Sequence, residues 1–316
     1  MDYNATPSSW LPNLDSGLLW AIVISSVLSM IGCLLVFCVY FAVFRELNEY
    51  SYPKVLYRMV VYMSIASLTL VIAGIGIAYD ISNRNCNPFW LFLREFSFIS
   101  SVFWAAYYAY SLKEIITNYL EVSLTEIEKQ GFLVAVVAPM ICSAIFFIAS
   151  FHKELGFDCY ITLEGRSPSF KYMILFGFLV PICGAFGFSV YCYIRIGLEL
   201  WMKAPMEGEI NRILKELVLF PIALFVCCLF PVLNTIFMVF LEAKLPTFIL
   251  LHHIFQQSTG LINALAYGLK YASYVFIKNQ LRNVKRTFQS VHNMQLEPEQ
   301  KSDSELIEIQ ERLVGK

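Results

Sequence analysis

A few ionisable side chains interrupt the long apolar stretches of this sequence, and they mark where the chain could bind a ligand. Arg94 and Glu95 lie near one end of an apolar stretch, and His252 and His253 lie within 247–269. Ionisable residues at membrane depth are costly to bury and usually serve a function. Arg94 could bind an anionic group such as phosphate, or its side chain could reach the headgroup layer. Because adjacent residues on a helix point about 100° apart, Arg94 and Glu95 need not pair.

Further polar and aromatic side chains are expected at the same end of the bundle. Gln256 follows His252 by four residues and therefore shares its helical face. These two side chains could line a pocket or anchor the helix at the membrane interface. Adjacent histidines rarely converge on one ion, so we expect neither a metal nor another cofactor, and no enzyme activity. The expected ligand-binding set is Trp90, Arg94, Glu95, Lys171, Tyr172, His252, His253 and Gln256.

The elements that must hold these residues are membrane helices. Of the 316 residues, 58% are hydrophobic and only 15% are charged, whereas a soluble domain is about 25% charged. This composition excludes a disordered chain, a secreted disulfide scaffold and a nucleic-acid-binding domain. The apolar runs are continuous rather than alternating, which favours helices over strands. Seven runs are long enough to span a bilayer: 18–44, 55–79, 89–112, 131–151, 172–194, 217–241 and 247–269.

The fold class predicted is therefore an all-α membrane protein, a bundle of seven transmembrane helices. Most Lys and Arg residues fall in connections that are cytoplasmic if the N-terminus is outside the cell. The glycosylation sequon at Asn4 would then be extracellular. We expect a multi-pass protein of the plasma membrane with four parts: an extracellular N-terminus (1–17), the helical domain (18–271), a juxtamembrane helix (272–289) and a mostly disordered cytoplasmic tail (290–316).

The juxtamembrane helix is predicted from its amphipathic pattern. Apolar residues recur at helical spacing at Ile277, Leu281, Val284 and Phe288, and basic residues occupy the intervening positions. Such a helix is expected to lie on the anionic lipid of the inner leaflet.

Two cysteines fall on the predicted outer face. Cys86 precedes the third apolar run and Cys159 lies in the second outer connection. Unpaired thiols are unusual on an oxidising face, so a disulfide between them is expected, although two free thiols are the alternative.

Polar residues and prolines in the last two runs could allow two arrangements of the bundle. Pro231 frees a backbone carbonyl, which Asn234 could satisfy, or it could be an ordinary membrane-helix proline. Asn263 and Tyr267 share a helical face, and Asn263 should face protein rather than lipid.

At the inner ends of the helices, charged residues could form a docking site for a partner protein. They could equally reflect only the positive-inside bias. The residues are Lys113, Glu114, Arg195, Arg212 and Lys215.

Three segments resemble the cyclic-AMP receptor-like family of G-protein-coupled receptors, known from slime moulds. GLINALAYG at 260–268 resembles the G-F-x-N-a-x-x-Y-G signature of its seventh helix. LFPIALFVCCLFPVLN at 219–234 resembles its sixth helix, with two prolines ten apart. SSVFWAAYYAYSL at 100–112 resembles its S-x-F-x-W segment, which contains Trp104 here.

The resemblance implies a receptor that passes an extracellular small-molecule signal, with cyclic AMP one candidate, to a heterotrimeric G protein. It also implies a conformational switch built from Trp104, Pro231, Asn234, Asn263 and Tyr267. The chain departs from the family at Ser67, where the second helix usually has an acidic residue. A transporter and a receptor that does not couple to G proteins are the alternatives.

Overall fold

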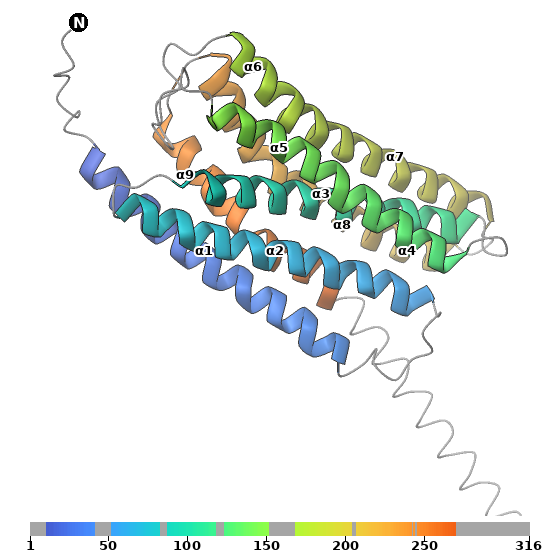
Figure 1. The fold of residues 1–316 in the computed structure, drawn as a ribbon. Helices are drawn as coiled ribbons and strands as arrows, with labels where there is room; N and C mark the ends of the chain where they lie inside the picture. Colours follow the sequence, from blue (N-terminus) through green and yellow to red (C-terminus); the bar gives the residue numbers. More distant parts are fainter. Residues whose placement is uncertain are drawn as a thin grey trace, which may run out of the picture. The chain divides into compact units, whose positions relative to one another are not determined.

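The computed structural model describes most of the helical domain. The described residues are 11–41, 52–82, 87–117, 123–151, 168–203, 207–241, 243 and 245–269. Every regular element within these ranges is a helix (Figure 1). Met1–Leu269 forms one compact unit, and the second unit, Lys270–Lys316, lies outside the described residues. The predicted juxtamembrane helix and tail therefore stay predictions.

Within the described residues, six helical stretches are long and apolar enough to cross a membrane, and they overlap the first six predicted runs. They are Leu19–Val39, Lys54–Asp80, Pro88–Thr117, Thr125–Ile145, Lys171–Glu199 and Phe220–Val239. Large apolar side chains such as Trp20 and Phe176 remain well exposed on their outward faces. Apolar faces directed away from the protein core fit a lipid environment. The prediction of a helical, multi-pass membrane protein is thus confirmed.

Four of the spans belong to uninterrupted α-helices. They are α1 (Leu11–Val39), α2 (Tyr52–Ser82), α3 (Pro88–Thr117) and α8 (Glu207–Val239). Helix α8 stays α-helical although it contains both Pro221 and Pro231.

The other two spans each contain a π-helical turn. The chain passes from α4 (Leu124–Phe132) through η2 (Leu133–Val137) into α5 (Ala138–Phe151), and from α6 (Pro168–Ile174) through η4 (Leu175–Leu179) into α7 (Val180–Lys203). A π turn leaves backbone groups that need other partners. In η2, the hydroxyl of Ser100 on α3 donates to the carbonyl of Ala135 at 2.6 Å. In η4, Pro181 follows closely and lacks the N–H that an α-helix would direct to the carbonyl of Gly177.

The seventh predicted run is helical but divided. It forms α9 (Pro246–Gln257), α10 (Thr259–Asn263) and η5 (Ala264–Leu269). Ser258, with ψ of 0°, separates α9 from α10. The hydroxyl of Thr259 donates to the carbonyl of Gln256 at 2.7 Å, so a side chain replaces part of the interrupted backbone pattern. None of the three pieces is long enough to cross a bilayer alone.

Close backbone contacts attach this divided segment to α1. The backbone N–H of Gly260 donates to the hydroxyl of Ser29 at 3.0 Å. A Cβ placed on Gly32 would lie 2.6 Å from the Cα of Leu261, so only glycine allows this approach. Small residues are the usual means by which membrane helices pack closely. Helix α10 is therefore an integral part of the helical unit.

Helix α3 lies inside the bundle. It packs against α2, α5 and α7, while α8 packs against α7 and α9 (Figure 1). Half or more of the α3 sequence is buried, from Arg94 through Ser111. This position places the ionisable residues of α3 against protein rather than against lipid.

Candidate functional site

Arg94 and Glu95 form a buried ion pair on α3. The Nε and Nη2 atoms of Arg94 both donate to Glu95 Oε1, at 2.9 and 2.6 Å. Only 9% of the Arg94 side chain and 4% of the Glu95 side chain is exposed. The sequence left open whether these neighbours pair, and the structure shows that they do. Burial favours this pairing, because an isolated charge inside protein is very costly.

A second set of polar side chains links α8 to α9. Asn234 Nδ2 donates to His252 Nδ1 at 3.1 Å, and His252 Nε2 donates to Gln256 Oε1 at 2.9 Å. The ring of His253 lies 5.1 Å from that of His252, centroid to centroid. All four side chains are buried. The two hydrogen bonds give His252 a defined tautomer, with its proton on Nε2.

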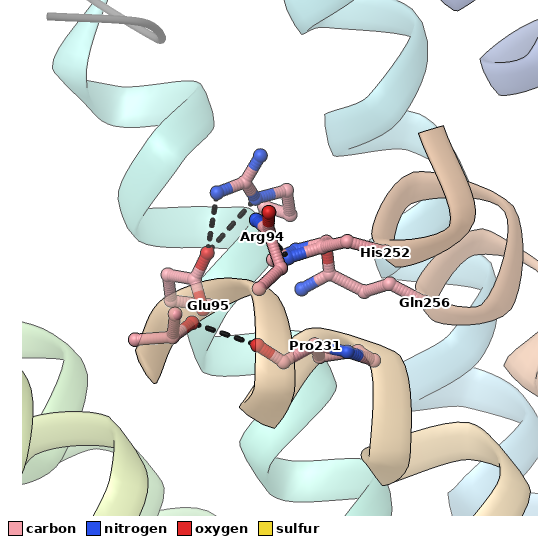
Figure 2. A network of polar contacts seen from close by, with 7 residues as sticks. Arg94, Glu95, Pro231, His252 and Gln256 are labelled. Atoms are coloured by element: carbon pink, nitrogen blue, oxygen red, sulfur yellow. Dashed lines mark hydrogen bonds and ion pairs between the residues drawn. The ribbon is translucent and has the colours of Figure 1, made fainter. Parts of the chain in front are cut away.

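Together these residues form a single site, which we call the Arg94 cluster. In Figure 2 the side chain of Arg94, from α3, extends toward His252 and Gln256, from α9. Three buried polar atoms of the cluster have no hydrogen-bond partner in the described part of the chain: Glu95 Oε2, Asn234 Oδ1 and Gln256 Nε2. The members of the cluster are Arg94, Glu95, Asn234, His252, His253 and Gln256.

The other residues expected in the ligand-binding set lie elsewhere. A Cβ on Gly76 of α2 would overlap the ring of Trp90, so Trp90 packs against α2. Lys171 is partly buried on α6, and the adjacent Tyr172 is 61% exposed. The structure thus brings together the α3 and α9 members of the expected set, and it adds Asn234 from α8.

Asn234 does not play the part that the sequence suggested. Within α8, the hydroxyl of Thr235 donates to the carbonyl of Pro231 at 2.8 Å (Figure 2). The side-chain amide of Asn234 instead crosses to His252 on α9. The observed role of Asn234 is thus a contact between helices. The Thr235 bond involves the carbonyl of Pro231 itself, not that of Cys227, which Pro231 frees.

Asn263 connects three helices at another level of the bundle. Its Nδ2 donates to the hydroxyl of Ser101 on α3 at 2.9 Å, and Ser101 lies 3.5 Å from the hydroxyl of Ser67 on α2. All three residues are buried. Asn263 therefore faces protein, as the sequence predicted. Ser67, which stands where the resembling family has an acid, is part of this chain of polar contacts.

Of the remaining residues expected in the switch, the structure describes the side chain of Trp104 but not that of Tyr267. Trp104 is buried and packs its ring 4.9 Å from that of Tyr62 on α2, centroid to centroid. Tyr267 lies in η5, but its side chain is outside the described residues.

Two charged residues expected at the inner ends of the helices pair with each other. Lys113 Nζ lies 2.7 Å from Glu114 Oε1 and 5.3 Å from the centre of the Tyr110 ring. Arg195 is exposed on α7. Arg212 and Lys215 lie on α8, and their side chains are outside the described residues.

Sequence reasoning missed a polar contact between α2 and α4, which we call the α2–α4 clamp. Arg58 Nη2 lies 2.8 Å from Glu128 Oε2, and the hydroxyl of Tyr62 donates to Glu128 Oε1 at 2.7 Å. The one available signal was Arg58, the sole charged residue of its apolar run. Nothing in the sequence identified Glu128 as its partner.

Several expectations lie outside the described residues. Asn4, Cys86 and Cys159 are all in undescribed segments, so the sequon and the disulfide stay predictions. Among the described residues, no group of His, Cys, Asp and Glu side chains is arranged to hold a metal ion. The sequence matches no model of a known protein family, and no curated protein matches it.

Proposed function

We propose that this chain is a cell-surface receptor that couples to a heterotrimeric G protein and binds a small extracellular ligand at the Arg94 cluster. The observation that carries the proposal is the cluster itself. It brings charged, imidazole and amide side chains from α3, α8 and α9 into the interior of an apolar helical unit. Three of its buried polar atoms remain available for a ligand. Polar groups of this kind in a membrane bundle mark functional sites.

The proposal includes a seventh span. Helix α9, α10 and η5 follow one another with a break only at Ser258, and α10 packs closely on α1. Broken helices are tolerated at membrane depth where protein surrounds them. Seven spans place the N-terminus outside the plasma membrane and the C-terminus in the cytoplasm, in agreement with the distribution of Lys and Arg.

The resemblance to cyclic-AMP receptor-like proteins supports the same function. Its most specific segment, Gly260 to Gly268, contains Asn263, which contacts α3 through Ser101. The resemblance makes cyclic AMP one ligand to test.

Signal transfer in this proposal is a shift between two arrangements of the bundle. The hydrogen bond from Asn234 to His252 joins α8 to α9 inside the proposed ligand site. A ligand that binds one arrangement more tightly increases the population of that arrangement. Movement of α8 would open the inner ends of the helices, near Lys113 and Arg195, to a G protein.

The test is guanine-nucleotide exchange on G proteins reconstituted with the full chain in lipid vesicles, with and without cyclic AMP. We expect exchange above that of receptor-free vesicles. Exchange that cyclic AMP stimulates would identify the ligand, and unstimulated exchange would leave a receptor with another ligand. An absence of exchange across several Gα types would contradict the coupling. Uptake of labelled solutes by the same vesicles would then indicate a transporter.

A further inference from the structure

The Arg94 cluster also indicates the charge of the ligand. This inference takes from the proposed function only that the ligand binds at this cluster. Glu95, Asn234 and Gln256 come from three different helices and are at most 6% exposed. Each has one polar atom without a hydrogen-bond partner in the described part of the chain. Leaving a buried donor or acceptor unpaired destabilises the folded protein, so three such atoms in one cluster favour a molecule that pairs with them.

The hydrogen bonds within the cluster determine what such a molecule must offer. Asn234 donates through Nδ2 to His252, which leaves its carbonyl oxygen as an acceptor. Gln256 accepts through Oε1 from His252, which leaves its Nε2 as a donor. In this arrangement the ligand supplies a donor to Asn234 and an acceptor to Gln256. Flipping both amides together with the tautomer of His252 exchanges the two roles, so in either case the ligand supplies one donor and one acceptor.

The charges of the cluster also determine which ligand it can bind. Glu95 Oε1 receives both the Nε and Nη2 donors of Arg94, so the guanidinium is already matched by a carboxylate. The second carboxylate oxygen, Oε2, is the charged atom that remains unpartnered. An anion would have to displace Glu95 from Arg94 and would leave a second anion nearby. A cation can pair with Oε2 while the Arg94 pair stays intact, through a short, charge-assisted hydrogen bond.

We propose that the ligand of the Arg94 cluster is a small organic cation with a protonated amine, not an anionic phosphate. The ammonium group donates to Glu95 Oε2. A further N–H or O–H donor of the ligand pairs with Asn234 Oδ1, and an acceptor of the ligand pairs with Gln256 Nε2.

The experiment measures thermal unfolding of the full chain in lipid nanodiscs with matched probes. Propyl, phenylethyl and indolylethyl skeletons are each tested as the primary amine, the alcohol and the carboxylate, and cyclic AMP is tested beside them. Selective binding to the folded state raises the unfolding temperature with ligand concentration. We expect at least one amine to raise it, with its alcohol at least about tenfold weaker and its carboxylate without effect. A rise in the unfolding temperature with cyclic AMP or with the carboxylates would overturn the proposal. So would the absence of a rise with every one of the amines.

Two variants test whether stabilisation by amines depends on the carboxylate of Glu95. Glu95→Gln removes the negative charge that pairs with the buried guanidinium of Arg94, and this loss can unfold the variant. The double variant Arg94→Met, Glu95→Gln removes both charges and avoids that cost. We expect both to lose the response to amines, whereas Glu126→Gln, on the exposed face of α4, keeps it. An amine response that persists in the double variant would refute the role of Glu95.

The outcome is independent of G-protein coupling. Stabilisation by amines without nucleotide exchange would support the ligand class and contradict the proposed coupling. Exchange stimulated by cyclic AMP, together with stabilisation by anions, would support the receptor and contradict the ligand class.

Discussion

The ion pairs of the Arg94 cluster and of the α2–α4 clamp use their carboxylates differently. In the clamp, Glu128 on α4 has both oxygens engaged by α2: Oε2 pairs with Arg58, and Oε1 accepts from Tyr62. In the cluster, Glu95 uses a single oxygen, and its partner is the adjacent residue of the same helix. The clamp therefore joins two helices, whereas the Arg94–Glu95 pair joins none.

Burial makes this difference informative. The paired side chains of the clamp are 19% and 21% exposed, while those of the cluster are 9% and 4% exposed. An unpaired carboxylate oxygen costs more where burial is deeper, yet it occurs in the deeper pair. The comparison teaches that a carboxylate with both oxygens paired between helices stabilises the fold, and a more deeply buried carboxylate with one unpaired oxygen is the better candidate for binding.

Among the substitutions that test this comparison, Glu95→Gln is expected to lower the free energy of unfolding most. The variant removes the negative charge that pairs with the buried guanidinium of Arg94, and we expect the free energy of unfolding to fall by about 3–5 kcal/mol. Chemical unfolding in detergent micelles measures the change. The double variant Arg94→Met, Glu95→Gln should recover most of the loss, and a double variant as unstable as the single one would contradict this charge explanation.

A smaller loss of stability is expected from a substitution in the α2–α4 clamp. Glu128→Gln removes the charge that pairs with the half-buried Arg58, and we expect a loss of about 1–2 kcal/mol in the same unfolding measurement. Glu126→Gln is the matched control, because Glu126 lies on the same helix and is exposed. Equal effects of the two substitutions would show that the clamp contributes nothing beyond a surface charge.

Tyr62→Phe separates the hydrogen bond of the clamp from its ring packing. The ring can still pack against Trp104, but Glu128 loses its hydroxyl donor. We expect a loss of about 1 kcal/mol. Tyr172→Phe removes an exposed hydroxyl and should change stability by no more than about 0.5 kcal/mol. An effect of Tyr62→Phe no larger than that of Tyr172→Phe would argue against the bond.

The smallest effect on stability is expected from Gln256→Leu. The variant loses the hydrogen bond to His252 and also removes a buried N–H group that has no partner in the described residues. These effects oppose each other, so we expect a net change of about 0.5 kcal/mol or less. A loss above about 2 kcal/mol in the unfolding measurement would mean that Gln256 Nε2 is paired in the folded protein.

Much of the fold was predictable because the length of an apolar run is a local property. The first six predicted runs overlap the six long apolar helices that the described residues contain. The seventh is divided at Ser258, and this division was not predicted. The run of polar residues Gln256, Gln257, Ser258 and Thr259 was its only warning, since their side chains compete with backbone hydrogen bonds.

The candidate site was predictable only in part. The cost of burying ionisable groups correctly drew attention to Arg94, Glu95, His252 and His253, which the structure places in one buried cluster. Trp90 was expected to line the same pocket, and the structure shows its ring against Gly76 of α2. Depth in a membrane can be estimated from the sequence, whereas the direction in which a side chain points depends on how each helix is rotated.

The sequence by itself determined that this chain forms long apolar helices and that few ionisable residues lie within them, because both follow from the residue types along one segment. Only the tertiary structure decided which side chains meet. It paired Asn234 with His252 and Arg58 with Glu128, and it left one oxygen of Glu95 unpaired. Such partners come from different helices, and they are selected by the packing of apolar faces and of small residues at close contacts such as Gly32 and Gly260.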